Sequence, residues 1–486
     1  MIKHTTIESA VLSFARINAI LNNSKKLDLP EYRAFVQDVI YHLKHKSKNC
    51  DLGMLWNALT EQKEAKVIME LSKLEEPIMI HADSGGLQQI TLGIKVDEAG
   101  KQGIYERQAK YSTHSMSFDK MPIMVDESQK NKNISMSLNH SAKYFVRELL
   151  YDVGRESGFN VLDQCQAIAK LPKEEVKSKI LVIIQGSKFE DYQEYARGLF
   201  SVFEELPEDE RERYYELIGG LSMGMSGITN YFDLIDLYCR APKDLTAAPA
   251  KLRKTIHFLG VGGPTKVAPL YAINPTFFGE DNDVHYTFDS TSRTSCSTYG
   301  RFTENTKHRG HIKLKTCNLG RDLTNTVYEH LNDVRDEFGP LLEKHFPYYD
   351  ISDIDKFRNI FSPYRDDKLR LSKELLEEYG ERKGAIAYLN CTSVSDFLHW
   401  GIELVKFFEL LDEYSTGEFR AINNKPLRHA INTLYKCKSY EEYMKPGIRE
   451  FMYLTLKDIK LGNINIVETV KDFENKKIVS LDEEEW

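Results

Sequence analysis

Three aspartates end or closely follow short apolar stretches of the chain. Asp83 closes IMIHAD, Asp119 lies in HSMSFDKMP, and Asp289 lies in YTFDSTS. A carboxylate can act as a nucleophile, as a general acid or base, or as an acceptor of hydrogen bonds from a polar substrate. Taken alone, each aspartate is better explained as a turn former or a helix cap. Together at predicted strand ends they indicate an enzyme site, in a pattern that fits glycosidases, aldolases and metal enzymes alike.

The elements that would position these residues recur along the chain. A short apolar run of β type ends in a polar or glycine-containing loop, and in several places a stretch with apolar residues three and four apart follows. The runs occupy residues 77–86, 114–122, 179–187, 216–224, 256–264 and 286–292. Strands that alternate with helices predict parallel pairing with right-handed crossovers.

Two architectures fit this alternation, an open doubly wound sheet and a closed barrel. An open sheet concentrates its polar loops at one switch point. Here almost every predicted strand end carries polar or glycine residues, as expected when all the loops surround the mouth of a barrel. We therefore predict a (β/α)8 TIM-type barrel with insertions and a catalytic site in residues 1–324. A mainly helical region, residues 325–486, would contribute the closing barrel helix and nucleic-acid contacts.

Composition sets broad limits on function. With 41% hydrophobic and 28% charged residues, the 486-residue chain has the composition of a soluble globular protein. No apolar run approaches the roughly 20 residues that cross a bilayer, and the start of the sequence lacks the features of a signal peptide. Seven widely spaced cysteines fit reduced thiols and a cytoplasmic location. The net charge of -8 means that a nucleic-acid partner requires a local basic patch.

A family resemblance emerges from several motifs together. HADSGGLQ resembles the DSGG(F/Y)Q motif of the tRNA-guanine transglycosylase superfamily. The similarity continues in order through MSFDKMP, IIQG, IGGLSMG, FLGVGGP and FDSTSRTSCSTYGRFT, and it spans roughly residues 77 to 303. These stretches are similar to the family's FDE, VQGG, GGLAVGE, MGVGTP and FDCVxPTRxARxGxxFT segments. Each piece is weak singly, but six pieces in one order make a specific signal.

The resemblance implies roles for individual residues. Asp289 would be the nucleophile that attacks C1′ of the sugar, and Asp83 would be the general acid and base. Asp119 would accept hydrogen bonds from guanine N1–H and the exocyclic amine, a donor pair that adenine lacks. Gln185 and the backbone N–H of Gly220 would bind O6. The full set of substrate-binding residues would be Ser84, Asp119, Gln185, Gly219, Gly220, Leu221, Ser222 and Arg293, with Leu221 and Ser222 facing the 7-position substituent.

Departures from the family pattern bear on the substrate. The CxCxxC zinc cluster that should follow the last motif is absent, and Cys391 with His399 is a poor remnant of it, so no metal site is predicted. FDSTSRT keeps Arg293 but lacks the proline and second arginine, which in the family help to hold the tRNA anticodon loop. This combination most resembles the DpdA-type DNA-guanine transglycosylases of phages and genomic islands.

The sequence thus predicts an enzyme that exchanges guanine in DNA for a 7-deazaguanine, with 7-cyano-7-deazaguanine as the donor base and no cofactor. Its partners would be DNA, the free deazaguanine base and guanine, with no membrane, and its location would be the host cytoplasm if a phage encodes it. A stacked guanine must be extruded from a duplex before it can react, or the enzyme must act on single strands. Two alternatives stay open: the same chemistry on tRNA, and a catalytically inactive barrel that binds nucleic acid. The oligomeric state is not predicted.

Two further segments each have two interpretations. LGVGGP could bind a dinucleotide, but it lacks the GxGxxG spacing, which favours a turn into a helix capped by Thr265. KHRGHIKLK, residues 307–315, is either the last barrel strand or an arm beside the barrel. It could hold phosphates or form an edge strand that lysines protect from pairing.

Overall fold

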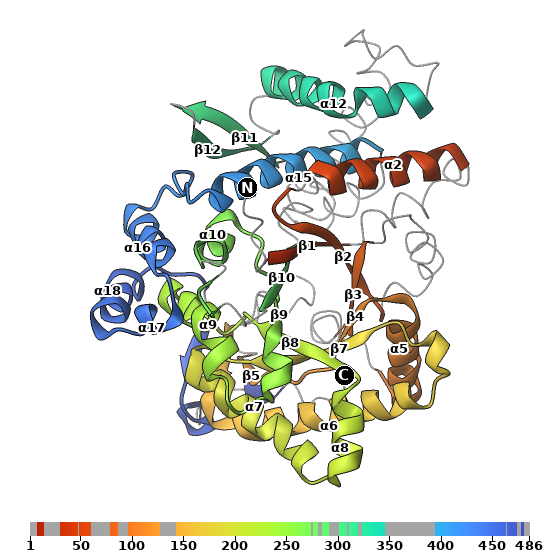
Figure 1. Cartoon of the computed structure of the whole chain (residues 1–486), viewed down its shortest axis with the longest axis vertical. Helices are drawn as coiled ribbons and strands as arrows, with labels where there is room; N and C mark the ends of the chain where they lie inside the picture. Colours follow the sequence, from red (N-terminus) through yellow and green to blue (C-terminus); the bar gives the residue numbers. More distant parts are fainter. Residues whose placement is uncertain are drawn as a thin grey trace.

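A parallel β-barrel surrounded by helices forms the centre of this mixed α/β protein (Figure 1). The computed structural model describes residues 7–13, 30–46, 48–59, 78–85, 96–126, 142–273, 276–279, 284–290, 301–308, 311–318, 323–345, 394–462, 464–473 and 478–480. No helix among these residues is long and apolar enough to cross a membrane.

The barrel strands follow one another around a closed ring. They are β1 (Ile7–Ser13), β2 (Asp51–Asn57), β3 (Met79–Asp83), β4 (His114–Met116), β7 (Lys179–Gln185), β8 (Ile218–Gly224), β9 (Thr255–Phe258) and β10 (His285–Ser290). Their order in the sheet is β1-β10-β9-β8-β7-β4-β3-β2, and β1 pairs with both β10 and β2. Every neighbouring pair is parallel. The predicted α/β barrel is confirmed in this general form.

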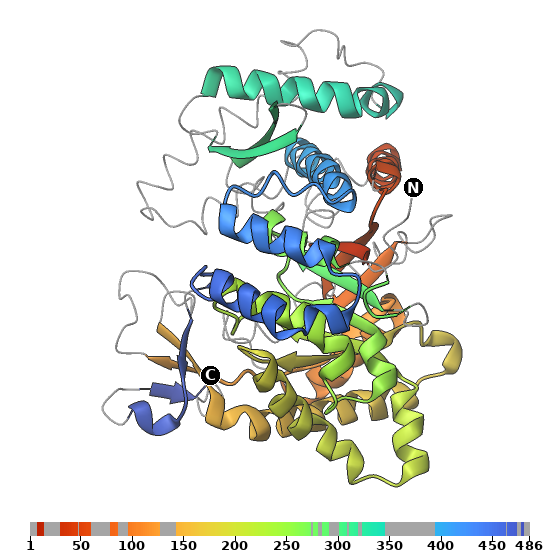
Figure 2. The ribbon, with the colours of Figure 1, turned by 60° about the vertical axis from the view of Figure 1, so that its left-hand side comes forward.

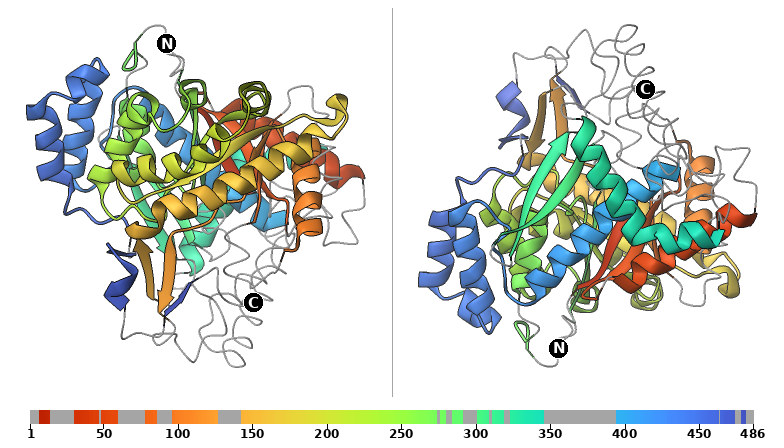
Figure 3. Two further views of the ribbon diagram at one scale, coloured as in Figure 1. Left: turned by 90° about the horizontal axis from the view of Figure 1, so that it is seen from below. Right: turned by 90° about the horizontal axis from the view of Figure 1, so that it is seen from above.

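Helices cover the outside of the barrel, so its strands are buried on both faces. β7 shows this in its sequence, because every residue of KILVIIQ after Lys179 is buried. The described helices between barrel strands include α5 (Glu98–Tyr111), α6 (Leu150–Ala169), α7 (Phe189–Glu204), α8 (Glu208–Tyr215), α9 (Tyr231–Asp244) and α10 (Pro264–Ala272). α6 and α7 lie side by side on one face of the molecule (Figure 3, left).

Glycines allow α6 and α7 to approach closely. A Cβ atom on Gly154 would overlap the carbonyl oxygen of Tyr195, and one on Gly198 would overlap that of Tyr151. Larger residues at either position would push the helices apart. The hydroxyl groups of Ser157 on α6 and Tyr195 on α7 lie 2.6 Å apart at this contact. Both residues also bind the loop after β4, so the helix contact helps to fix that loop.

A small separate sheet joins an insertion after β4 to the end of the chain (Figure 2). The insertion supplies β5 (Ile123–Asp126) and β6 (Ala142–Val146), and the C-terminal part supplies β13 (Asn465–Val467) and β14 (Ile478–Ser480). The order is β13-β6-β5-β14, so the C-terminal strands flank the insertion on both sides. The region predicted to be mainly helical therefore also contributes strands.

The remaining described helices pack beside and above the barrel. They are α2 (Pro30–Lys46), α12 (Leu323–His345), α15 (Val394–Ser415), α16 (Lys425–Lys436), α17 (Tyr440–Tyr443) and α18 (Pro446–Leu456). α15 contacts α10, α12 and α2, and α18 contacts α9. From above, α12, α15 and α2 lie over one end of the molecule (Figure 3, right). The predicted boundary at residue 324 falls in the first turn of α12, and the division into two domains stays a prediction.

The basic segment around residues 307–315 belongs to a hairpin outside the barrel. β11 (Arg301–His308) and β12 (His311–Asn318) pair with each other in an antiparallel sheet of their own. Of the two predicted placements, the structure therefore shows the arm beside the barrel and not its last strand, which is β10.

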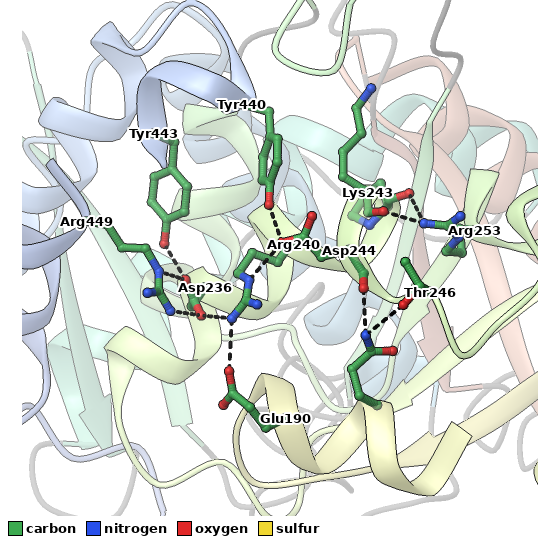
Figure 4. A network of polar contacts seen from close by, with 12 residues as sticks. Glu190, Asp236, Arg240, Lys243, Asp244, Thr246, Arg253, Tyr440, Tyr443 and Arg449 are labelled. Carbon is green, nitrogen blue, oxygen red and sulfur yellow. Dashed lines mark hydrogen bonds and ion pairs between the residues drawn. The ribbon is translucent and has the colours of Figure 1, made fainter. Parts of the chain in front are cut away.

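Polar contacts anchor the C-terminal helices to barrel helix α9 (Figure 4). Asp236 of α9 accepts hydrogen bonds from Nε and Nη2 of Arg449, each at 2.9 Å, and from the hydroxyl group of Tyr443 at 3.0 Å. At the end of α9, Asp244 accepts a hydrogen bond from the hydroxyl group of Tyr440. The side chain of Asp236 is 4% exposed, so these donors stabilise a buried charge.

Candidate active site

The carboxyl ends of the strands bring Asp83, Asp119 and Asp289 to one mouth of the barrel. Asp83 is the last residue of β3, Asp289 is the penultimate residue of β10, and Asp119 follows β4 by three residues. Burial and the neighbouring charge of Asp289 raise the pKa of Asp83, and burial and the charge of Asp83 raise the pKa of Asp119. Because such effects require short separations, the three aspartates form one cluster.

The site of Asp83 makes its charged form costly. Burial, together with the charge of Asp289, raises the pKa of Asp83 to about 6. Hydrogen bonds from the backbone of Gly85 and Ser84 and from the side chain of Asn57 oppose this increase. The β2–β3 register places Asn57 beside Asp83, and its Nδ2 lies 3.2 Å from Asp83 Oδ2. A carboxyl group with this pKa can both donate and accept a proton near neutral pH.

Glycine follows this acid for a backbone reason. Gly85 has φ +84°, and a Cβ atom there would lie 2.6 Å from the Cβ of Leu59, so the turn after β3 excludes other residues. Ser84 is buried, and its hydroxyl group donates a hydrogen bond to the carbonyl oxygen of Ser117 at 3.2 Å. The side chain predicted to bind the base thus joins the loops that follow β3 and β4.

Asp119 and Gln185 form a pair across neighbouring strands. The Nε2 atom of Gln185, at the end of β7, donates a hydrogen bond to Asp119 Oδ2. Burial raises the pKa of Asp119 to about 6, and this hydrogen bond opposes the increase. Gln185 is 3% exposed, and its Oε1 has no hydrogen-bond partner among the described residues. The pair therefore offers a carboxyl group and an unused amide oxygen to a polar ligand.

Side chains of α6 and α7 hold the loop that contains Asp119. The backbone N–H of Lys120 donates to Ser157 Oγ of α6 at 2.8 Å, and the hydroxyl group of Tyr195 of α7 donates to the carbonyl oxygen of Lys120 at 2.8 Å. These bonds fix the backbone next to Asp119. They help to position Asp119, which lies on an irregular loop and not on a strand.

Asp289 is placed by the turn that follows β9. It is 7% exposed, and its Oδ1 accepts a hydrogen bond from the backbone N–H of Gly260. Gly260 has φ +72°, a conformation that directs its N–H toward β10 and favours glycine. The Nε2 atom of His257 lies 3.6 Å from the same carboxyl oxygen. A carboxyl group that a backbone N–H orients in this way is suited to nucleophilic attack.

The loop after β9 leads into α10 as predicted, but with a different cap. Gly263 is the N-cap residue and Pro264 is the first helical residue. The side chain of Thr265 instead accepts a hydrogen bond from the hydroxyl group of Tyr231 at 2.5 Å. The predicted capping by Thr265 was wrong because the helix begins one residue earlier, at Pro264, so Thr265 lies within the first turn and not at the N-cap position.

Ser222 and Leu221 lie on opposite faces of β8. Ser222 is in register with His257, which faces the barrel interior, and its buried Oγ has no hydrogen-bond partner among the described residues. Leu221 is in register with Ile256 and belongs to the apolar core. Of these two residues, Ser222 is therefore the one whose side chain faces the barrel interior below the mouth.

Gly219 and Gly220 lie at the amino end of β8, away from the mouth. Gly220 is in register with Leu181, whereas Gly224 is in register with Gln185. Four residues of strand separate the two levels, which corresponds to roughly 13 Å. This placement contradicts the expectation that Gly219 and Gly220 contact guanine. Gly224 is the β8 glycine beside Gln185.

The two glycines at the amino end have a packing role instead. A Cβ atom on Gly219 would lie 2.6 Å from the Cβ of Lys179, and one on Gly220 would overlap the carbonyl oxygen of Thr255. Glycine at these positions lets β8 lie close to the beginnings of β7 and β9. The motif match identified the strand correctly but not the part of it that lies at the site.

Some residues of the cluster have no sequence signal of their own. Asn57 and His257 contact the two proposed catalytic acids, and neither belongs to the set of site residues predicted from the motifs. Their positions next to Asp83 and Asp289 follow from strand register, which one sequence does not reveal. Arg293, the remaining predicted site residue, lies outside the described residues.

Within the part of the chain that the structure describes, no three His, Cys, Asp or Glu side chains are arranged to hold a metal ion. His399 is buried in α15, and Cys391 lies outside the described residues. No protein-family model matches the chain, and no curated protein is significantly similar to it.

Proposed function

We propose that this protein is a guanine transglycosylase on a (β/α)8 TIM-type barrel, which exchanges guanine in DNA for a 7-deazaguanine base. The observation that carries the proposal is the cluster of Asp83, Asp119 and Asp289 at the mouth of a parallel barrel, with Gln185 beside Asp119. The order of the sequence motifs agrees with it.

Asp289 and Asp83 divide the chemistry of base exchange. The Asp289 carboxylate forms a bond to C1′ as the C1′–N9 bond breaks, and the electron pair leaves with the guanine. Asp83 donates its proton to the departing base. The incoming deazaguanine then attacks C1′, loses its N9 proton to Asp83 and displaces Asp289. Two displacements retain the configuration at C1′ and restore both carboxyl groups.

Asp119 and Gln185 provide base selection. The Asp119 carboxylate accepts hydrogen bonds from guanine N1–H and the exocyclic amine. Gln185 Nε2 donates one hydrogen to Asp119, and we assign its second hydrogen to guanine O6. Adenine would leave these buried groups unpaired, which costs about 1–3 kcal/mol for each group. We assign the 7-position substituent to Ser222 of β8, whose buried hydroxyl group has no partner among the described residues.

DNA is the proposed acceptor because the chain lacks the features that help related enzymes hold a tRNA anticodon loop. The proline and the second arginine after the nucleophile are absent from FDSTSRT, and no CxCxxC cluster follows. A guanine in a duplex must leave the stack, at a cost of a few kcal/mol, before C1′ reaches Asp289. We propose 7-cyano-7-deazaguanine as the donor base.

Transfer of labelled base tests the proposal. Purified protein is incubated with duplex DNA, single-stranded DNA or tRNA, each with labelled guanine or 7-cyano-7-deazaguanine. We expect incorporation into DNA, and a covalent protein–DNA adduct that Asp289→Ala abolishes and the exposed-residue control Asp209→Ala retains. Incorporation only into tRNA would replace DNA by tRNA as substrate. Binding of nucleic acid without any transfer would indicate an inactive barrel.

A further inference from the structure

A short turn, residues 186–188, connects the site residue Gln185 to helix α7. Ser187 in this turn is buried, and its backbone N–H and its hydroxyl group both donate hydrogen bonds to Asp191 Oδ2, the first at 3.1 Å. Asp191 is buried as well and lies in the first turn of α7. The Asp191 carboxyl group therefore fixes the backbone of the turn two residues after Gln185.

Arg147, which directly follows β6, binds both partners of this contact. Its Nε lies 3.2 Å from Asp191 Oδ1, and its Nη2 donates to Ser187 Oγ at 3.2 Å. Its Nη1 donates to Glu468 Oε1 in the C-terminal part of the chain. The planar guanidinium group of arginine holds several acceptors in fixed directions, which the point charge of lysine does not. One side chain thus joins the turn after β7, helix α7 and the C-terminal part.

The small sheet places Arg147 for these contacts. β13 pairs with β6, and Val467 is in register with Val146, the residue before Arg147. The backbone N–H of Glu148, the residue after Arg147, donates to the carbonyl oxygen of Glu468 at 3.0 Å. The C-terminal strand and the residue that follows it therefore hold the backbone on both sides of Arg147.

Gln185 is the site residue that depends on this turn. Its Nε2 donates one hydrogen to Asp119 Oδ2, and its second hydrogen is the one assigned to guanine O6. Asp119 has separate supports, because Ser157 and Tyr195 bind the backbone of Lys120. A movement of the turn after β7 therefore displaces Gln185 and leaves the loop of Asp119 in place.

We propose that Arg147 is a positioning residue for base recognition, which fixes the turn after β7 and thereby directs the Gln185 amide toward guanine O6. Arg147 acts through Ser187 and Asp191 and does not touch the base. This role rests on the proposed transglycosylase function, because that function supplies the base. The contacts that fix the turn are independent of it.

Calorimetric titration with three bases tests the role. 6-Thioguanine replaces O6 by sulfur, a weaker acceptor, and hypoxanthine lacks the exocyclic amine that Asp119 would bind. In Arg147→Ala, guanine should bind about tenfold more weakly, the equivalent of one hydrogen bond. The preference for guanine over 6-thioguanine should fall by the same factor, whereas the preference over hypoxanthine should keep its wild-type value. An equal loss of affinity for all three bases would overturn the proposal.

Arg155 of α6 supplies a matched control. It also binds a carboxyl group and a serine hydroxyl group, those of Glu205 at 2.7 Å and Ser201 at 3.1 Å, but at the opposite end of α7 from the turn. Arg155→Ala should bind all three bases as the wild type does. Arg147→Lys keeps a cation beside Asp191 and should restore part of the preference for guanine over 6-thioguanine. The same preference in both alanine variants would overturn the proposal.

Hydrogen exchange and steady-state rates supply the second test. In Arg147→Ala, the Ser187 amide should exchange at least about tenfold faster, while the amides of β8 keep their wild-type rates. KM for guanine should rise about tenfold with kcat unchanged, because a loss of uniform binding raises KM alone.

The outcomes separate this role from the proposed function. A wild type that binds none of the three bases would refute the proposed function and the recognition role together. A wild type that binds guanine, with unchanged guanine affinity or unchanged Ser187 exchange in Arg147→Ala, would refute the role of Arg147 alone. A fall in kcat with KM unchanged would also refute it.

Discussion

Asp83 and Asp119 occupy positions in which an ionised carboxyl group is less stable than in water. Burial raises the pKa of each to about 6, above the usual value of 3.8. The folded protein therefore binds these protons more tightly than the unfolded chain does. This contribution favours folding in acid and is lost as the pH rises from about 4 through about 6. Near neutral pH, the site is a source of instability that the rest of the fold must offset.

Asp83→Asn should therefore stabilise the protein in a pH-dependent way. Asparagine keeps an acceptor for Asn57 but carries no charge. We expect the free energy of unfolding to increase at pH 8 by on the order of 1–2 kcal/mol. The gain should shrink as the pH falls through 6 and 4 and approach zero only below the usual value of 3.8, where Asp83 is protonated in both the folded and the unfolded chain. Urea denaturation at pH 8, 6 and 4 measures the difference.

The matched control for this stability measurement is Asp209→Asn, which removes an exposed carboxyl group of α8. It should change the free energy of unfolding by less than about 0.5 kcal/mol at each pH. A loss of stability in Asp83→Asn at pH 8, or a gain of equal size at every pH, would show that the Asp83 charge is well accommodated.

Sequence reasoning was most effective for residues that end strands. Asp83, Asp119, Gln185 and Asp289 were all predicted from motifs, and the structure places them together because the ends of parallel strands meet at one mouth. His257 could not be found in this way. His257 matters because the neighbouring strand β10 places Asp289 beside it, and one sequence does not reveal that pairing.

At the scale of the element, strand register decides which residues reach the site. The motif IGGLSMG contains three glycines, and the resemblance assigned the base contact to the first two. The pairing of β8 with β7 shows instead that Gly224 lies beside Gln185 and Gly220 beside Leu181. A shift of four residues along one strand moves a residue from one end of the barrel to the other. Single-chain sequence patterns contain little information about such a shift.

Two alanine variants on this strand should affect different properties, one the binding of guanine and the other the stability of the fold. A Cβ atom on Gly224 would overlap the amide of Gln185, so Gly224→Ala should weaken guanine binding at least about tenfold, the equivalent of one hydrogen bond. A Cβ atom on Gly220 would overlap the carbonyl oxygen of Thr255, so Gly220→Ala should lower the free energy of unfolding by about 1–3 kcal/mol. Calorimetric titration with guanine and urea denaturation measure the two effects.

Each of these variants is the control for the other, because both add one methyl group to the same face of β8. We expect Gly220→Ala to bind guanine as the wild type does, once it is folded. Reduced affinity in Gly220→Ala with normal stability would restore the original assignment of this glycine to the base. It would also show that the register of β8 differs from the one described.

At the scale of the whole molecule, the C-terminal helices are held to the barrel by a buried charge. Asp236 binds Arg449 and Tyr443 from the C-terminal helices and Arg240 from its own helix. Asp236→Ala would leave the arginines without their shared partner. Because both arginines are partly exposed, we expect a loss of about 2–3 kcal/mol, less than for a fully buried pair.

Hydrogen exchange locates this effect. In Asp236→Ala, the amides of α17 and α18 should exchange faster, while those of β7 and β8 should stay protected. Arg197→Ala breaks the exposed ion pair with Glu194 and should change stability by less than about 0.5 kcal/mol. Uniformly faster exchange throughout the barrel would mean that the C-terminal helices and the barrel unfold as one unit.

The general architecture could be predicted because alternating strands and helices leave a strong periodic pattern. The small sheet of β13, β6, β5 and β14 could not be predicted. Its C-terminal strands, β13 and β14, have three residues each and pair with an insertion more than 300 residues earlier in the chain. Such short strands form only because β5 and β6 are already present as partners, so their own sequence contains almost no signal.

The same small sheet has a consequence for biosynthesis. β5 begins four residues after Asp119, yet its outer neighbour β14 ends at Ser480. A ribosome must translate past that serine before the loop proposed to select the base acquires the supporting strand β14. We expect nascent and prematurely terminated chains to contain a largely formed barrel that discriminates poorly between purines. If the proposed function holds, selective base exchange would then begin only after Ser480 has been translated.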